Sequence, residues 1–459
     1  MTELVIAGGT VYTPDGPRET DIHVTDGVIT AVGKASARRA AGVVDASGLY
    51  VVPGAIDVHV HSRDPGFPQK EDFGSLTAAA AAGGVTTVID MPNTVPAVDA
   101  PGLLEAKAAL ARSKARVDFG LWGLVRSSTT PDQLEGLAHA GATGFKAYLG
   151  YAFSLSRKQV LYTTDLDDPD HEAPPDYGTL ARLAPTIAGL ELPLAIHAED
   201  PGILTAFRRP LETYEDYLAA RPPEAEAVAI SASAEIAGAS GVRLHVAHLS
   251  SALGLAAARE ALQAGALISL ETSPHYLWLT DQDFPRLGTA MKVLPPIRHT
   301  QDRAALVDGL AKGVIGTVAT DHAPHTDAEK ALSFIDAPAG SPGVQTLYLS
   351  CLELAQRMGD VWLAPPWVSL APARLTGLSD SKGTIAPGYD ADLVLVDPQQ
   401  KTVVRPANMR SRQRHGALEG MELGFAIREV YLRGVLVARD DKPVGRAVGR
   451  MVRPSRGSG

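Results

Sequence analysis

The sequence predicts an α/β protein whose main part is a parallel TIM (β/α)8 barrel, and two observations lead to this prediction. Through the middle of the chain, short apolar runs alternate with Ala-rich helical stretches about eight times, as strands and helices do in such a barrel. Polar side chains recur where the apolar runs end, and barrel enzymes build their active sites at the C-terminal ends of the strands. A doubly wound sheet has a similar alternation, so the placement of the polar residues favours the barrel.

Both ends of the chain are instead predicted to form short strands separated by Gly and Asp-Gly turns, which is typical of hairpins. The strand-like ranges are 4–13, 21–33, 42–52, 383–398, 426–440 and 445–452. The chain therefore divides into an N-terminal β-region at 1–52, a barrel at 53–384, a C-terminal β-region at 385–453 and a tail at 454–459 that we expect to be disordered.

Within the barrel region, apolar runs and helical stretches follow one another in chain order. The expected strands after the first are 85–92, 117–125, 144–150, 192–200, 242–250, 267–276 and 314–325. Helices are expected between them, among others at 103–114, 131–140, 225–238 and 252–265. The acidic insertion at 154–177 has little apolar periodicity, and we expect either a lid over the barrel mouth or a solvated surface loop.

The composition excludes several classes of partner. The 459 residues carry a formal net charge of -10, which argues against binding to nucleic acid or to an anionic membrane. No run reaches the roughly 18 apolar residues of a membrane span, and the N-terminus does not resemble a signal peptide. Cys351 is the single cysteine, which fits a reducing compartment, so we expect a cytoplasmic protein.

Several strand ends carry side chains that bind metal ions in proteins. His59 and His61 are two residues apart, so both point to the same face of an extended strand. His197, His248 and Asp321 each lie at the end of another apolar run. Neutral imidazoles and carboxylates are ligands of zinc, although they also suit manganese or cobalt. A single His is more often a core or capping residue, and it is the whole set that predicts a metal site.

Lys146 lies in the enclosed apolar stretch GFKAYLG, where an ammonium group without a partner is costly. A bare ammonium has no lone pair and cannot bind a metal. A deprotonated lysine can add carbon dioxide to become a carbamate, which is a carboxylate on a long arm and can bridge two ions. We favour the carbamate, N6-carboxylysine, over a lysine that reaches from the strand end to solvent.

Asp321 is the expected catalytic residue as well as a ligand. Two divalent ions would make water a nucleophile at neutral pH. A carboxylate next to that water could take its proton and pass it to a leaving nitrogen. The plainer alternative is that Asp321 caps the following helix, but capping does not account for the rest of the set.

Together these motifs resemble the cyclic amidohydrolase branch of the amidohydrolase superfamily, which includes dihydroorotases, allantoinases and hydantoinases. The resemblance covers essentially the whole chain in order, through GGTVYTPDG, VVPGAIDVHVHSRDPG, GGVTTVIDMPNT, GFKAYLG, HAED, HVAHLSS, ETSPHYLWLTDQD, MKVLPPIR, ATDHAPH and GTIAPGYDADLVLVD. It implies a metal-bearing barrel flanked by a small β-sandwich made from both chain ends. It also implies hydrolysis of a ring C–N bond in a cyclic amide or ureide.

The resemblance implies a binuclear centre, which we expect to hold two Zn(2+) ions. By motif match its ligands are His59, His61, Lys146, His197, His248 and Asp321, whereas His245 matches no ligand position. Relatives of this kind commonly form dimers or tetramers, so a homo-oligomer is expected.

Within the branch, the stretches HSRDPG, QKEDF and MPNT are most similar to dihydroorotases, which interconvert N-carbamoyl-L-aspartate and dihydroorotate in pyrimidine biosynthesis. The resemblance assigns the grip on a substrate carboxylate to Arg63, Asn93 and His325. Each of the three could instead have a local role. Arg63 could pair with Asp64 or Asp72, Asn93 could cap the turn after MPN, and His325 could cap the next helix.

Two departures weaken the similarity to dihydroorotases. Leu294 stands where they usually have Asn, and Gln345 stands where they often have Glu and is closer to allantoinases. Allantoinase or hydantoinase (dihydropyrimidinase) activity is therefore the alternative. A non-catalytic scaffold relative is a remote alternative, because such proteins usually lose ligands and this chain keeps all six.

Overall fold

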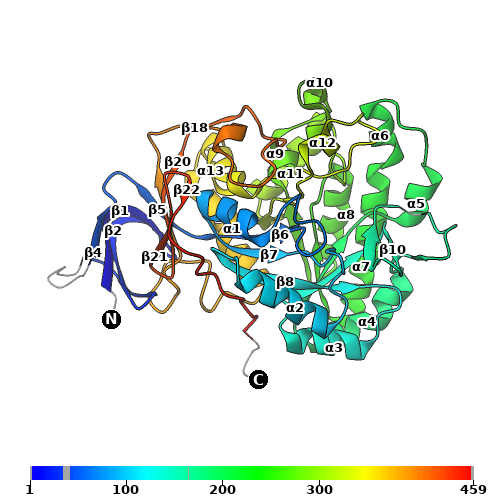
Figure 1. Ribbon diagram of the computed structural model, residues 1–459, viewed down its shortest axis with the longest axis horizontal. Coiled ribbons are helices and arrows are strands. Elements are labelled where there is room, and N and C mark those ends of the chain that lie inside the picture. Colours follow the sequence, from blue (N-terminus) through cyan, green and yellow to red (C-terminus); the bar gives the residue numbers. More distant parts are fainter. Residues whose placement is uncertain (1–2, 35–41, 164, 456–459) are drawn as a thin grey trace.

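Eight parallel strands form the barrel in the computed structural model, which describes residues 3–34, 42–163 and 165–455 (Figure 1). The strands are β6 (Ala55–Val60), β7 (Val85–Asp90), β8 (Asp118–Val125), β9 (Gly144–Tyr148), β13 (Pro193–His197), β14 (Arg243–Val246), β15 (Ile268–Thr272) and β16 (Thr317–Val318). They pair in chain order, and a parallel bridge between Val60 and His322 joins the last strand region to the first. The prediction of a (β/α)8 barrel is confirmed.

The barrel strands are buried along almost their whole length, as expected for parallel strands covered on both faces. Helices surround them: α1 (Phe73–Ala82), α2 (Pro101–Arg112), α3 (Pro131–Ala140), α4 (Tyr177–Gly189), α7 (Pro223–Ser240), α8 (Ala252–Gln263), α11 (Thr300–Ala311) and α13 (Leu347–Arg357). Shorter helices lie in the connections: α5 (Pro201–Ala206), α6 (Tyr214–Ala220), α9 (Pro274–Trp278), α10 (Phe284–Leu287), α12 (Asp327–Lys330) and α14 (Ala371–Leu375).

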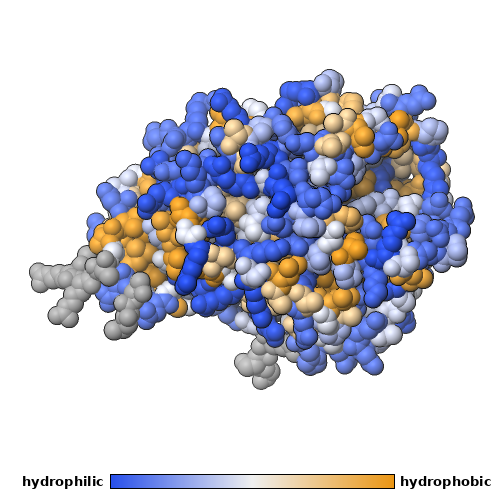
Figure 2. Space-filling view, viewed as in Figure 1, coloured by the Kyte–Doolittle hydropathy of each residue, from blue (hydrophilic) through white to orange (hydrophobic). Residues whose placement is uncertain are grey.

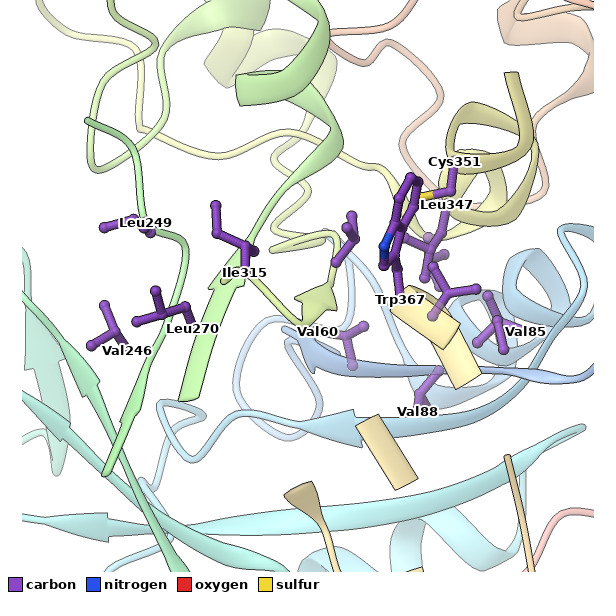
Figure 3. Packing of buried hydrophobic residues seen from close by; sticks show 14 of the residues in the cluster. Val60, Val85, Val88, Val246, Leu249, Leu270, Ile315, Leu347, Cys351 and Trp367 are labelled. Atoms are coloured by element: carbon purple, nitrogen blue, oxygen red, sulfur yellow. The ribbon is translucent and has the colours of Figure 1, made fainter. Parts of the chain in front are cut away.

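Local sequence explains where the helices begin and how they cover the barrel. Asp72 caps α1, because its side chain accepts a hydrogen bond from the amide of Ser75 at 2.9 Å. The packing onto the barrel is visible in Figure 3, where Leu347 and Cys351 of α13 and Trp367 of a later short helix gather beside Val60 of β6. These buried apolar contacts hold the strand that carries His59 and that His61 directly follows.

The two chain ends form one nine-stranded sheet beside the barrel (Figure 1). Its strands are β1 (Glu3–Thr13), β2 (Gly16–Thr25), β3 (Val28–Val32), β4 (Gly42–Asp45), β5 (Tyr50–Pro53), β17 (Leu393–Asp397), β20 (Ala426–Leu432), β21 (Val435–Arg439) and β22 (Lys442–Pro443). A β-bulge between Ile6 and Gly9 bends β1, which pairs with β4 before the bulge and with β5 after it. The sheet encloses an apolar core of its own, so the predicted β-domain from both chain ends is confirmed.

The surface of this sheet differs from that of the barrel. Figure 2 shows a group of hydrophobic residues over the chain-end sheet, whereas hydrophobic residues on the barrel are scattered among hydrophilic ones. Val28, Val43 and Val435 are among its exposed apolar side chains. None of the helices in the described part of the chain is long and apolar enough to cross a membrane.

A buried ionic cluster joins the sheet to the barrel. The ammonium group of Lys382 lies within 3.0 Å of carboxylate oxygens of Asp118 at the start of β8, of Asp390 and of Asp392. Residues 449–452 also run along the start of β8, where the Gly449 amide donates to the carbonyl of Ala115 at 3.0 Å. The divisions at 52/53 and 384/385 stay a proposal. Of the tail at 454–459 that we expected to be disordered, residues 456–459 lie outside the described residues, and the amide of Ser455 donates to the carbonyl of Gly377 at 2.8 Å.

The insertion between β9 and α4 is a small sheet of three strands, β10 (Ala152–Ser154), β11 (Gln159–Leu161) and β12 (His171–Glu172). Asp170 holds its turns together, because it accepts hydrogen bonds from the Ser156 amide and hydroxyl at 2.8 and 2.9 Å. The remaining strands, β18 (Thr402–Val403) and β19 (Glu422–Leu423), pair with each other near α13.

Candidate active site

His59, His61 and Asp321 come together at the C-terminal end of the barrel. His59 lies near the end of β6, His61 directly after it, and Asp321 follows β16. Oδ1 of Asp321 lies 3.1 Å from Nε2 of His61 and 3.4 Å from Nε2 of His59. Burial lowers the pKa of His61 to about 4, so its imidazole is neutral at physiological pH, which is the form that binds metals. The three side chains could hold one metal ion.

His197 and His248 form a second pair at the same end of the barrel. His197 is the last residue of β13 and His248 lies two residues after β14. Nδ1 of His197 lies 2.9 Å from Nε2 of His248, and burial lowers the pKa of both rings. The His248 ring also lies 5.2 Å from the His59 ring, measured between centroids, so the two groups of ligands are neighbours.

Lys146 projects from β9 and is fully buried. Its ammonium nitrogen has no hydrogen-bond partner among the described residues. Burial lowers the pKa of Lys146 to about 8, although the charges of Glu271 and Asp321 act in the opposite direction. An amine that is easily deprotonated and has no partner fits the predicted carbamate, because the added carboxylate would supply the oxygen ligands that a bare amine lacks.

Three residues of the site have left-handed backbone conformations. The φ angles are 59° at Arg63, 48° at Asp321 and 41° at His248. Such conformations are uncommon for residues other than Gly, and strained backbone of this kind concentrates at functional sites. Each of these residues comes just after a barrel strand, where the chain turns away while its side chain stays at the barrel mouth.

A second layer of polar groups orients the histidines. Because an ionised carboxylate only accepts hydrogen bonds, Nδ1 of His59 must donate to Oε1 of Glu271, which lies 2.8 Å away. Nε2 of His197 donates in the same way to Glu199 at 2.7 Å, and Glu199 also pairs with Arg221. In each ring the other nitrogen is left with a free lone pair for a metal.

Asn93 has a similar role beside His61. Its Oδ1 lies 2.7 Å from Nδ1 of His61, and its amide nitrogen donates to the hydroxyl of Tyr162 at 3.0 Å. Glu199 and Glu271 are site residues that we did not predict from the sequence. The signal available in the sequence was their place in the motifs HAED and ETSPHY, which begin at the ends of buried strands.

Several of the predicted ligands line a cleft at the mouth of the barrel. Its walls are His59, His61, Tyr148, Tyr151, Tyr162, His197, His248, Leu294, Asp321, Ala323, Ala339 and Gly340. The three tyrosines are further residues that the sequence analysis missed. Tyr162 belongs to the insertion, so the insertion covers part of the cleft, and this favours the lid over the solvated loop.

The three residues predicted to grip a carboxylate do not line this cleft. Nη2 of Arg63 lies 3.2 Å from Nε2 of His325, and Nε of Arg63 donates to the carbonyl of Pro324 at 3.3 Å. Burial and the charges of Arg63 and Lys70 lower the pKa of His325. Arg63 and His325 therefore contact each other beside the cleft, while Asn93 is engaged with His61 and Tyr162.

Gln345 also lies away from the cleft. Its side-chain amide donates to the carbonyl of Asn408 at 2.9 Å, and its Oε1 accepts from the amide of Arg410 at 2.7 Å. Gln345 therefore joins the barrel to the segment before β19 by hydrogen bonds. The Gln found here, where dihydroorotases often have Glu, serves this contact and does not face the cleft.

Two family models match the chain: Dihydro-orotase-like over residues 48–146 and Amidohydrolase family over residues 226–437. The chain is 37% identical to an allantoinase of Streptomyces avermitilis over 456 residues, which are 98% of this chain and 99% of that protein. It is 33% identical to a dihydroorotase of Methanosarcina acetivorans over 440 residues, which are 93% of this chain and 90% of that protein.

Solved structures of hydantoinases share the fold of the whole chain. An L-hydantoinase from Arthrobacter aurescens superposes with a TM-score of 0.91 at 28% identity, covering 99% of this chain and 100% of that one. A D-hydantoinase from Thermus sp. does so with a TM-score of 0.85 at 26% identity, covering 98% and 99%. The similar relatives are mostly named allantoinase, so they favour our alternative over the dihydroorotase prediction. The chain belongs to the cyclic amidohydrolase branch of the amidohydrolase superfamily and is an enzyme that hydrolyses a cyclic amide.

Proposed function

We propose that this enzyme opens the ring of an uncharged cyclic ureide, with allantoin as the model substrate. The observation that carries the proposal is the cleft lining, which contains no Lys or Arg side chain among the described residues. A substrate carboxylate would be held by such groups. Tyrosine hydroxyls suit the neutral C=O and N–H groups of a ureide instead, and several similar relatives are named allantoinase.

For the metal centre, we infer that His59, His61 and Asp321 hold one divalent ion and that His197 and His248 hold another. The carbamate of Lys146 would supply oxygen ligands to both. Zinc is the expected metal, because neutral imidazoles and carboxylates make up this donor set. Bound divalent ions would acidify water and polarise the ring carbonyl.

Asp321 is the group that would move the proton. Burial raises the pKa of Asp321, whereas the neighbouring His59 and His61 lower it. The net pKa is about 2, so the carboxylate is ionised at neutral pH. It could accept a proton from the attacking water and deliver it to the ring nitrogen as the C–N bond breaks. Because Nδ1 of His61 and of His59 are engaged with Asn93 and Glu271, the rings facing Asp321 keep a fixed orientation.

Dihydroorotate hydrolysis is the second candidate, and Arg63 is the observation in its favour. The Arg63 side chain is buried, and no carboxylate lies within ion-pairing distance of it in the described part of the chain. A buried guanidinium without an acid partner is costly. A substrate carboxylate could neutralise it if the cleft extended toward Arg63 and His325 in the complex.

One assay panel tests the proposal. Purified enzyme reconstituted with zinc in bicarbonate buffer is offered allantoin, dihydroorotate, hydantoin and dihydrouracil, and kcat/KM is measured for each. We expect the highest value for allantoin. A higher value for dihydroorotate than for every uncharged ring would overturn the proposal and establish the second candidate. If the enzyme hydrolyses another uncharged ring best, the proposed reaction class stands and the proposal of allantoin as the substrate is wrong.

A further inference from the structure

Tyr148 has a buried hydroxyl group for which the described structure provides no hydrogen-bond partner. It is the last residue of β9, and only 4% of its surface is exposed. Lys146 lies two residues earlier on the same strand, so both side chains project from the same face. The Tyr148 side chain lines the cleft together with the predicted metal ligands.

Three other buried tyrosines of this barrel are satisfied by backbone carbonyls. The hydroxyl of Tyr214 donates to Ile297 at 2.7 Å, that of Tyr217 donates to Val293 at 2.7 Å, and that of Tyr276 donates to Pro295 at 2.6 Å. A buried hydroxyl without a partner lowers stability, because it gives up its hydrogen bonds to water and gains none in return. The buried Tyr148 hydroxyl, which has no partner among the described residues, therefore calls for a partner from outside the chain.

The surroundings fix the position of this hydroxyl. The Tyr148 ring stacks on Tyr151 with 5.7 Å between centroids and 25° between planes, and its centroid lies 6.5 Å from that of His197. The ammonium nitrogen of Lys146 lies 5.3 Å from the centre of the ring. A ring packed against these neighbours holds its hydroxyl in a defined direction at little entropic cost on binding.

We propose that the hydroxyl of Tyr148 forms a hydrogen bond with the ring of the substrate, which makes Tyr148 a specificity-determining residue of this enzyme. The inference rests on the proposed function and deepens it. A neutral hydroxyl can donate to a ureide carbonyl or accept from a ureide N–H, and a cyclic ureide presents both groups.

The substitution Tyr148→Phe removes the hydroxyl and keeps the ring. We expect kcat/KM for allantoin to fall by about 10- to 100-fold, the loss typical of a substrate group left unpaired in a buried site. The melting temperature should equal or exceed that of the wild type, because an unsatisfied buried hydroxyl is removed. The zinc content per chain should stay unchanged, which separates a substrate contact from an effect on the ligands.

Tyr214→Phe is the matched control. It removes a buried hydroxyl that donates to a backbone carbonyl and lines no part of the cleft. We expect a lower melting temperature and a kcat/KM within about twofold of the wild type. This opposite pattern shows that the assay distinguishes a structural hydroxyl from one reserved for substrate.

The outcomes separate this inference from the proposed function. Failure of the wild type on allantoin, with turnover of another ring of the panel, overturns the substrate proposal alone. Tyr148→Phe is then judged on that other ring. A Tyr148→Phe variant within about twofold of the wild type on the best ring, or one with a clearly lower melting temperature, overturns the inference. A wild type that hydrolyses none of the four rings overturns both.

Discussion

Oε1 of Glu271 on β15 lies 2.8 Å from Nδ1 of His59 on β6, although the two strands are not neighbours in the sheet. The same oxygen accepts from the backbone amide of His248 at 3.0 Å, and Oε2 lies 3.2 Å from Nε2 of His245. One buried carboxylate thus orients one proposed ligand by its side chain and another by its backbone. His59 and His245 hold the pKa of Glu271 below its usual range, although burial acts in the opposite direction.

Glu271→Gln should weaken metal binding. Both carboxylate oxygens accept hydrogen bonds, so an amide must turn its NH2 group toward an imidazole N–H or force that ring into its other tautomer. We expect the zinc affinity to fall by about 10- to 100-fold, as is typical when a group behind a metal ligand is changed. Isothermal titration calorimetry, in which zinc is added to the metal-free protein, measures this change.

Glu199→Gln is the control for that variant. Oε2 of Glu199 accepts from His197 and pairs with Arg221, whereas Oε1 has no partner among the described residues. A glutamine can therefore place its NH2 group at the free position and keep its oxygen on His197. Equal losses of zinc affinity in the two variants would contradict the orienting role of Glu271.

Lys146 should bind carbon dioxide in a pH-dependent manner. Only the neutral amine reacts, and burial lowers the pKa of Lys146 to about 8, so the reactive form is lost as the pH falls below that value. At constant dissolved carbon dioxide, we expect metal-free protein to take up zinc roughly tenfold faster at pH 9 than at pH 7. A carbamate signal from carbon-13-labelled carbon dioxide would identify the product by NMR.

Lys146→Met keeps the length and apolar character of the stem and removes the amine. We expect no carbamate signal, fewer than two zinc ions per chain, and a melting temperature of the metal-free protein that is at least that of the wild type, since a buried amine without a partner is lost. A variant that still binds two zinc ions and is fully active would refute the proposed carbamate.

The sequence was sufficient for those parts of the site that depend on local geometry. The two-residue spacing of His59 and His61 placed both side chains on one face of a strand, and the ends of the apolar runs identified the barrel mouth. The contact between Glu271 and His59 could not be predicted in this way, because it depends on how the barrel closes between β16 and β6. The same holds for Tyr162, which reaches the cleft through the fold of the insertion.

Residue identity was a poorer guide to the substrate than to the metal. Arg63 and His325 stand where a resemblance to dihydroorotases implies a carboxylate grip, yet they contact each other and do not line the cleft. Hydrogen-bond partners brought by distant segments decide which donors remain free. For Asn93 that segment is the insertion, whose Tyr162 already accepts from its side-chain amide.

Tyr162→Phe should loosen the insertion over the cleft. The change removes the acceptor of the Asn93 amide and leaves the ring against Tyr151, 4.9 Å away between centroids. We expect KM to rise by about 3- to 10-fold with little change in kcat, since one hydrogen bond of ordinary strength is lost. Hydrogen exchange at residues 152–161 should become faster, which reports opening of the insertion directly.

Tyr177→Phe serves as its control. Tyr177 is the last residue of the insertion, and its hydroxyl donates to Asp200 at 2.8 Å, outside the cleft. Its loss should leave KM unchanged. If Tyr162→Phe changes neither KM nor hydrogen exchange in 152–161, the insertion is not held over the cleft by this bond.

Asp321→Asn tests proton transfer. Asparagine has nearly the same shape as aspartate and tolerates the left-handed backbone found at this position, with φ of 48°, so the fold should be kept. The amide cannot accept and return a proton, and we expect kcat to fall by about 100- to 10,000-fold. Zinc content should be measured in the same preparation, because Asp321 is also a proposed ligand.

Asp308→Asn, which changes a partly exposed carboxylate paired with Lys312, is the control and should keep the wild-type rate. If Asp321→Asn binds the wild-type amount of zinc and keeps a rate near that of the control, the proton must be moved by another group.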